Sequence, residues 1–106
     1  MKQGDIVPIA FPFSDLSARK MRPALVLSND SYNKHRNLIL AGIYGKKKPH
    51  SIPITNAELI RKKLNKDSFI SFQNIFSAER TLVGKPVDAL SAKKLDSVLR
   101  GVRDCF

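Results

Sequence analysis

The chain begins with a segment in which apolar residues recur at every second position. The segment GDIVPIAFPF has the period of two that predicts a β-strand, here over residues 5–13. Pro8 has no amide hydrogen, so we expect this strand to lie at a sheet edge or to leave one position unpaired. The side chains that share its apolar face are Val7, Ile9, Phe11 and Phe13.

Three apolar runs further along the chain also predict strands. PALVLS at 23–28 is continuous and short, as expected of a strand that is covered on both faces. LILAGIY at 38–44 predicts a third strand, which ends at Gly45. SIPI at 51–54 predicts a short fourth strand. The polar segment SDLSARK at 14–20 has no periodicity and predicts a loop.

The pattern changes after residue 54. Thr55 and Glu58 have the spacing of a capping box, which predicts a short helix that includes Leu59 and the lysines at 62 and 63. DSFISFQ at 67–73 and ERTLVGKPV at 79–87 return to a strand-like composition.

The C-terminal segment LSAKKLDSVLRGVRDCF predicts an amphipathic helix. Ser91 is a suitable N-cap, and apolar residues follow it with the spacing of one helix face. These residues are Leu95, Val98, Leu99 and Val102. Five or six short strands with limited helix predict an α+β, β-rich fold with a strongly curved, barrel-like sheet. The length of 106 residues, 42% of them hydrophobic, predicts one globular domain over residues 1–106.

Charge is the strongest signal in the composition. The chain has 19 Lys and Arg residues against nine Asp and Glu, a net charge of +10. Residues 1–66 hold 13 basic and four acidic residues, a net charge of +9, whereas residues 67–106 hold six and five. Solubility needs no such segregation, but a polyanionic partner would use it, because neutralised phosphates release their counterions. A solvated basic face and an acidic protein partner are the other interpretations.

Several classes of site do not fit the residues. One Cys and two His cannot make a structural zinc site, and no Asp/Glu cluster has metal-ligand spacing, so we expect neither metal nor cofactor. The five glycines are scattered and form no phosphate-binding loop. His35 and His50 could form an acid–base pair that cleaves RNA without metal, although each lies in a polar basic stretch typical of surface histidines.

The location of the protein is predicted from its apolar segments. No run approaches the length of a membrane span. Asp5, Pro8 and Pro12 interrupt the N-terminal apolar segment, unlike the core of a signal peptide. We therefore expect a cytoplasmic protein without membrane contact.

The residues GDIV…FPFSDLSARKMRPALVLSND resemble the N-terminal signature of the MazF/PemK toxin family. In that family a GD-[IV] strand leads into F-x-[FP], a polar loop and then R-P-x-[LV]-V-[LIV]-S. The match is close over about the first 30 residues, and the chain length, the basic middle and the C-terminal helix agree. The resemblance implies a small SH3-like barrel of five to seven strands with a C-terminal helix. It also implies a homodimeric, metal-independent endoribonuclease that cleaves single-stranded RNA, paired with an acidic antitoxin.

The resemblance places Arg22 at the position of the family's catalytic arginine, which acts at the scissile phosphate. Attack by a 2′-hydroxyl puts charge on the non-bridging oxygens, and a guanidinium can donate two hydrogen bonds to them. An arginine that only keeps a strand end soluble is the alternative. Tyr44 stands where the family has Thr or Ser at the end of the third strand, and its hydroxyl makes it the second catalytic candidate. Its alternative role is that of an ordinary aromatic residue at a strand end.

Two further positions depart from the family pattern. Ser17 stands where many members carry an acid, with Asp15 as the nearest carboxylate, and Phe76-Ser77 stands where a basic residue commonly precedes Ser or Thr. The candidates for RNA binding are Ser14, Asp15, Ser17, Arg19, Lys20, Lys46, Lys47, Lys48 and Ser77.

Two other functions stay open at this point. The related CcdB toxins share the fold and poison gyrase through protein contact. A degenerate member would bind RNA or antitoxin without cleavage.

Overall fold

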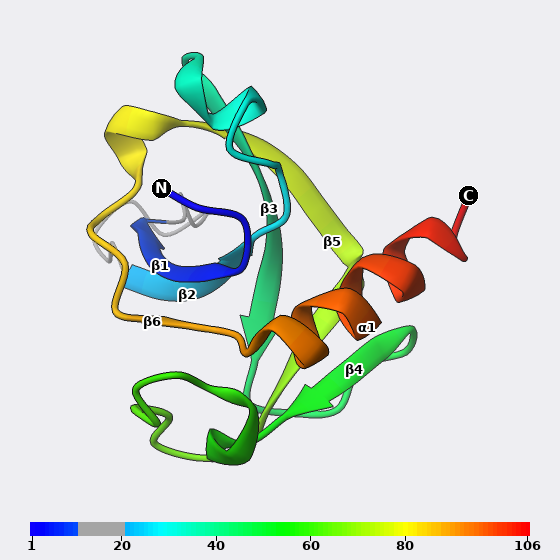
Figure 1. Ribbon diagram of the computed structural model, residues 1–106. Coiled ribbons are helices and arrows are strands. Elements are labelled where there is room, and N and C mark those ends of the chain that lie inside the picture. The colour runs from blue at the N-terminus through cyan, green and yellow to red at the C-terminus, as the bar shows by residue number, and fades with distance from the viewer. Residues whose placement is uncertain (11–20) are drawn as a thin grey trace, which may run out of the picture.

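The computed structural model describes residues 1–10 and 21–106, whose six strands form one sheet (Figure 1). The strands lie in the order β4-β5-β3-β2-β1-β6, and every neighbouring pair is antiparallel. The sheet is strongly curled and one α-helix packs on it, which confirms the predicted β-rich fold. The elements are β1 (Asp5–Ala10), β2 (Met21–Val26), β3 (Asn37–Tyr44), β4 (Ser51–Ile54), β5 (Ser68–Glu79), β6 (Asp88–Ala89) and α1 (Ala92–Arg103), with 3₁₀ turns η1 (Tyr32–Lys34), η2 (Asn56–Glu58) and η3 (Arg80–Leu82).

The central strands are buried on both faces. Because side chains alternate across a strand, β1, β2 and β3 contribute to two hydrophobic clusters. The cluster under α1 includes Ile6, Leu25, Ala41, Ile43, Ile54, Ile70 and Val98. The cluster on the opposite face is made of Val7, Ile9, Ala24, Val26, Leu38, Leu40 and Ala78. The prediction that the second strand is covered on both faces is confirmed, and β3 is covered in the same way.

The predicted C-terminal helix is also confirmed. The Ser91 hydroxyl accepts a hydrogen bond from Lys94 N (3.3 Å) and caps the start of α1. Val98 is fully buried, and the other apolar residues of the predicted face pack around the same cluster. Among the described residues, no helix has the length and apolar character needed to cross a membrane.

Pro8 lies opposite Pro23 in the pairing of β1 with β2. The Pro8 carbonyl accepts a hydrogen bond from Gly84 N (2.9 Å), so the missing amide hydrogen of Pro8 also faces away from β2. Because β6 pairs only with Asp5 and Ile6, the amide position of Pro8 faces a side of β1 where no strand continues the ladder, as the sequence predicts.

The helix predicted after Thr55 is wrong beyond its first turn. The capping box is present, with the Glu58 carboxylate accepting a hydrogen bond from Thr55 N (2.6 Å). However, only η2 forms, and Leu59 turns into an extended conformation and pairs with Leu90. The physical reason is burial together with hydrogen bonding: this path places Leu59 in the core, and Asp88 accepts hydrogen bonds from Arg61 N and Lys63 N, which a helix would direct to its own carbonyls.

The strand predicted over 79–87 is wrong as well. β5 continues to Glu79, η3 follows, and only Val83 makes an isolated bridge to β1. Gly84 approaches Pro8 so closely that a Cβ on Gly84 would lie 2.7 Å from Pro8 Cγ. This segment packs tightly across β1 instead of extending the sheet, and β6 has two residues.

β4 forms one outer edge of the sheet, since it pairs only with β5. Phe72 N donates a hydrogen bond to His50 O (2.8 Å), so the even-numbered residues at this edge direct their backbone groups toward β5. The backbone groups of Ser51 and Pro53 therefore face away from the sheet.

Candidate functional site

The site begins where β2 and β3 separate. Their pairing ends at Ala24 and Gly42. Leu27 N donates to Ile39 O (2.8 Å), so the odd-numbered residues of β2 direct their backbone groups toward β3. Pro23 is the next such residue toward the strand start, and it has no amide hydrogen to donate. The hydrogen-bonded ladder between β2 and β3 therefore ends at Pro23, because the proline ring replaces the amide hydrogen.

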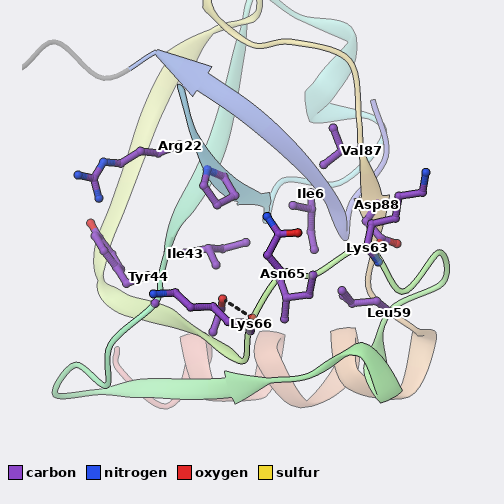
Figure 2. Close-up of a pocket in the computed structure, with 14 residues that line it drawn as sticks. Ile6, Arg22, Ile43, Tyr44, Leu59, Lys63, Asn65, Lys66, Val87 and Asp88 are labelled. Carbon is purple, nitrogen blue, oxygen red and sulfur yellow. Dashed lines mark hydrogen bonds between the residues drawn. The ribbon is translucent and has the colours of Figure 1, made fainter. Parts of the chain in front are cut away.

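A pocket of about 590 Å³ lies at this opening. Continuing the register of β2 with β3 would set Arg22 opposite Tyr44. Figure 2 shows these two side chains at one side of the pocket, with Lys63 and Asp88 at the other. The separated strand ends thus hold a guanidinium and a phenol at the same mouth.

Tyr44 is positioned by a second side chain and by a glycine. Asn74 Nδ2 donates a hydrogen bond to the Tyr44 hydroxyl, which leaves the hydroxyl proton available for another acceptor. A Cβ on Gly42 would lie 2.7 Å from Asn74 Nδ2 and 3.0 Å from the Tyr44 oxygen. A side chain at position 42 would therefore push this pair apart. Asn74 lies in β5 where the register with β3 shifts, between the pairs of Ala41 and Ile43.

One lysine lies over the phenol, and further cationic side chains line the pocket. Lys48 Nζ lies 5.0 Å from the centre of the Tyr44 ring, a cation–π distance. The Lys66 side chain lies over Gly45 in space that a Cβ would occupy. Arg22, Lys63 and Lys66 all line the pocket, where Asp88 is the one acid among the described lining residues. The mouth suits an anionic ligand.

The carboxylate of Asp88 is buried and holds the far wall of the pocket. Its Oδ1 accepts hydrogen bonds from Arg61 N and Ala89 N (both 2.8 Å), and its Oδ2 accepts one from Lys63 N (2.9 Å). Burial opposes ionisation, but these three hydrogen bonds and the Arg61 charge hold the pKa of Asp88 below its ordinary value. The loop that carries Lys63 is thereby fixed to β6.

We expect Asp88→Asn to lower the free energy of unfolding by about 1–3 kcal/mol at neutral pH. The new amide keeps an oxygen for Arg61 N and Ala89 N but turns an NH₂ group toward the Lys63 N–H. Because the folded pKa lies below the ordinary value of 3.8, Asp88 stabilises the fold above that pH. This contribution is lost as the pH falls through the folded pKa.

Urea unfolding at neutral and acidic pH measures both effects of Asp88→Asn. The variant should start less stable and lose less stability on acidification than the unchanged protein. Asp67→Asn is the matched control, because Asp67 is exposed. Equal losses in the two variants, or an unchanged pH dependence in Asp88→Asn, would contradict the assignment.

A family comparison covers almost all of the sequence. Residues 2–106 match the model described as PemK-like, MazF-like toxin of type II toxin-antitoxin system. The chain belongs to this family. The resemblance read from the N-terminal residues is thus confirmed, although no curated protein matches the chain by sequence.

Several solved structures share the fold of this toxin, among them mycobacterial proteins. An endoribonuclease in complex with its cognate antitoxin from Mycobacterial species has a TM-score of 0.76 at 11% identity, covering 98% of this chain and 90% of that one. The Mycobacterium tuberculosis toxin MazF-mt6 has a TM-score of 0.73 at 21% identity, covering 95% of each chain. At these identities the likeness shows the fold, and it confirms the predicted MazF-like architecture.

The structure brings part of the predicted toxin site together. Arg22 and Tyr44 share the pocket, and the predicted RNA-binding lysines Lys46, Lys47 and Lys48 follow Tyr44 as exposed residues. Ser77 is exposed on β5 opposite Ile39, outside the pocket, and its contact with RNA stays a prediction. The other candidates fall outside the described residues; they are Ser14, Asp15, Ser17, Arg19 and Lys20.

The two histidines of the toxin do not lie together. His35 precedes β3, and the His50 carbonyl contacts Phe72 in β5. Five residue pairs of the β3–β5 ladder, Asn37–Glu79 through Ala41–Ile75, separate these places. That is on the order of 15 Å of strand, too far for an acid–base pair on one phosphate within one chain.

Sequence reasoning missed the far wall of the pocket and the partner of Tyr44. The segment around Lys63, Asn65 and Lys66 was predicted as helix, and its register with Asp88 depends on a contact between distant parts of the chain. Asn74 is brought to Tyr44 by an irregularity in β5 that no local pattern reveals. Within the described ranges, no three His, Cys, Asp or Glu side chains gather as metal ligands.

Proposed function

We propose that this toxin is an endoribonuclease that cleaves single-stranded RNA by attack of a 2′-hydroxyl on the neighbouring phosphorus. The observation that carries the proposal is the convergence of Arg22 and Tyr44 at the mouth of a cationic pocket. Membership of the MazF-like family and the fold shared with a mycobacterial endoribonuclease support it.

Each side chain has a defined role in this reaction. The 2′-hydroxyl gives its proton to solvent water as its oxygen forms a bond to phosphorus. The bond from phosphorus to the 5′-oxygen of the next nucleotide breaks, which leaves a 2′,3′-cyclic phosphate, and the 5′-oxygen takes up a proton. Arg22 donates two hydrogen bonds to the non-bridging oxygens, where negative charge develops. The Tyr44 hydroxyl donates a hydrogen bond or a proton toward the phosphate. Its oxygen already accepts a hydrogen bond from Asn74, so its proton is free to point at the substrate. The nucleophile comes from the substrate, so the reaction requires no metal.

The cations around the pocket bind the RNA backbone in this proposal. Lys46, Lys47 and Lys48 lie beside Tyr44, within the part of the chain that carries a net charge of +9. Single-stranded RNA would be held through its phosphates, with a strong salt dependence. Two copies of the toxin, paired as a homodimer, would join their basic surfaces into a longer groove.

An acidic antitoxin is the proposed protein partner. One structural neighbour is an endoribonuclease bound to its cognate antitoxin. An acidic segment that folds on this basic surface would use the cations that RNA needs. Antitoxin and RNA would therefore exclude one another.

The direct test uses purified toxin with a single-stranded oligoribonucleotide and the deoxy oligonucleotide of the same sequence. We expect cleavage of the RNA only, because DNA lacks the 2′-hydroxyl, and a product that ends in a cyclic phosphate. A chelator should not change the rate, and RNA affinity should fall steeply as salt rises. Intact RNA, or activity that disappears with the chelator, would refute the proposal.

A further inference from the structure

We infer that the pocket beside Arg22 takes one unstacked nucleobase and that Asn65 reads its hydrogen-bonding edge. The inference rests on the proposed function, because this base would belong to a nucleotide next to the scissile phosphate. It assigns a specificity-determining residue and a ligand class to a part of the pocket beyond Arg22 and Tyr44.

The inner walls of the pocket are apolar, although its mouth is cationic. The apolar lining residues are Ile6, Pro23, Ile43, Leu59, Leu64 and Val87. Such walls suit the flat faces of a base and do not suit a phosphate group, which needs charge or hydrogen bonds on every oxygen. A volume of about 590 Å³ lies in the ordinary range of pockets that bind small organic ligands.

Asn65 supplies a solvent-accessible polar group among these walls. Figure 2 shows its side chain rising into the middle of the pocket, between Ile43 and Ile6. No hydrogen bond joins the Asn65 amide to the described part of the chain. A carboxamide offers one acceptor and a donor side by side, which matches the edge of a base, and unstacked RNA bases are read at their Watson–Crick edges.

The backbone on either side of Asn65 is held in place. Leu64 N donates to Asn56 Oδ1 (2.8 Å), and Leu64 O accepts from Asn56 Nδ2 (3.1 Å). Asp88 holds Lys63 N, and the Ser68 hydroxyl donates to Lys66 O (3.1 Å). An amide on such an anchored loop is positioned well enough to discriminate between bases.

The phosphates and the base of the proposed ligand would lie in different parts of the pocket. Arg22 and Lys66 lie at the mouth, where the phosphates of a bound strand would be, and Asn65 is a solvent-exposed residue whose side chain lies among the apolar lining residues. Contacts to phosphate position a strand without reading it, whereas contacts to a base edge give specificity. Substitutions at Asn65 and at Lys66 should therefore change different properties.

The test is the cleavage of an RNA pool with random positions, sequenced before and after exposure to the toxin. Asn65→Ala should reduce the preference at one nucleotide position about tenfold, within the range for loss of one bidentate contact. Asn65→Asp should raise the share of guanine at that position, because a carboxylate accepts from the N1–H and N2–H of guanine. Lys66→Gln should slow cleavage of all sequences alike.

Asn37→Ala is the matched control, because Asn37 is exposed at the far end of the β3–β5 ladder. It should leave the sequence preference unchanged, and thermal unfolding should show that both asparagine variants fold. An unchanged preference in Asn65→Ala and Asn65→Asp would overturn the inference while leaving the nuclease assignment intact.

A binding measurement separates the inference from the proposed function. The Arg22→Ala variant is used to select RNA from the same random pool, with and without a second substitution at Asn65. If the toxin cleaves nothing but the selected sequences share a base that disappears with Asn65→Ala, the nuclease assignment fails and the base pocket stands. If selection yields no shared base, the pocket does not read bases.

Discussion

Arg22→Ala is expected to lower the rate of RNA cleavage by about 10²–10³-fold, the usual cost of removing one donor to a developing oxyanion. Affinity for RNA should fall much less, because the lysines after Tyr44 and those lining the pocket still contact the backbone. The expected signature is a loss of rate at saturating protein. Single-turnover cleavage of a labelled oligoribonucleotide, with binding measured separately, distinguishes the two quantities.

Two further variants sharpen this experiment. Arg22→Lys should restore little activity, since a single ammonium cannot donate the two parallel hydrogen bonds of a guanidinium. Arg36→Ala is the matched control, because Arg36 is exposed before β3, away from the pocket. If Arg22→Ala cleaves as fast as the unchanged protein, Arg22 only keeps a strand end soluble. If RNA stays intact and toxicity is unchanged in that variant, the protein acts by protein contact.

Tyr44→Phe is expected to lower the cleavage rate by about 10²-fold, in the range for a group that transfers or donates a proton. The substitution removes only the hydroxyl, so the ring stays beneath Lys48 and the end of β3 keeps its packing. The second tyrosine of the chain provides the control. Tyr32 lies in η1, outside the pocket, and Tyr32→Phe should leave the rate unchanged.

Gly42→Ala tests whether the position of the Tyr44 hydroxyl matters. The new methyl group would lie 2.7 Å from Asn74 Nδ2, so Asn74 must move away from the phenol. The rate should fall without removal of any polar group, and the melting temperature shows whether the fold survives. Full activity in Tyr44→Phe would make Tyr44 a packing residue and leave Arg22 with a different partner.

The parts of the fold that were predicted from sequence are those fixed by local pattern. The alternation over Asp5–Ala10 and the N-cap at Ser91 act over a few residues, so β1 and α1 could be located before the structure. The segment after Thr55 has an equally clear capping box, but it does not continue as a helix. Arg61 N donates a hydrogen bond to Asp88, and Leu59 pairs with Leu90. Contacts between residues about 30 positions apart leave no periodic signal.

The site divides in the same way. Arg22 and Tyr44 were found by resemblance to a family motif, and the strand register brings them together. Asn65 and Asp88 have no such motif, and their importance depends on where the loop after Leu59 is held. The mouth of the pocket, with Arg22 and Tyr44, could therefore be predicted from the sequence, whereas the wall with Asn65 and Asp88 could not.

The outer edge of β4 has a consequence for association between chains. Of the two residues whose backbone groups face outward, Pro53 has no N–H, so Ser51 alone offers an amide hydrogen there. A strand from another molecule needs alternating donors and acceptors along an edge before it can extend a sheet. Pro53 thus disfavours edge-to-edge aggregation through β4. Copies of the toxin that pair should do so through side-chain surfaces and not by prolonging the sheet at β4.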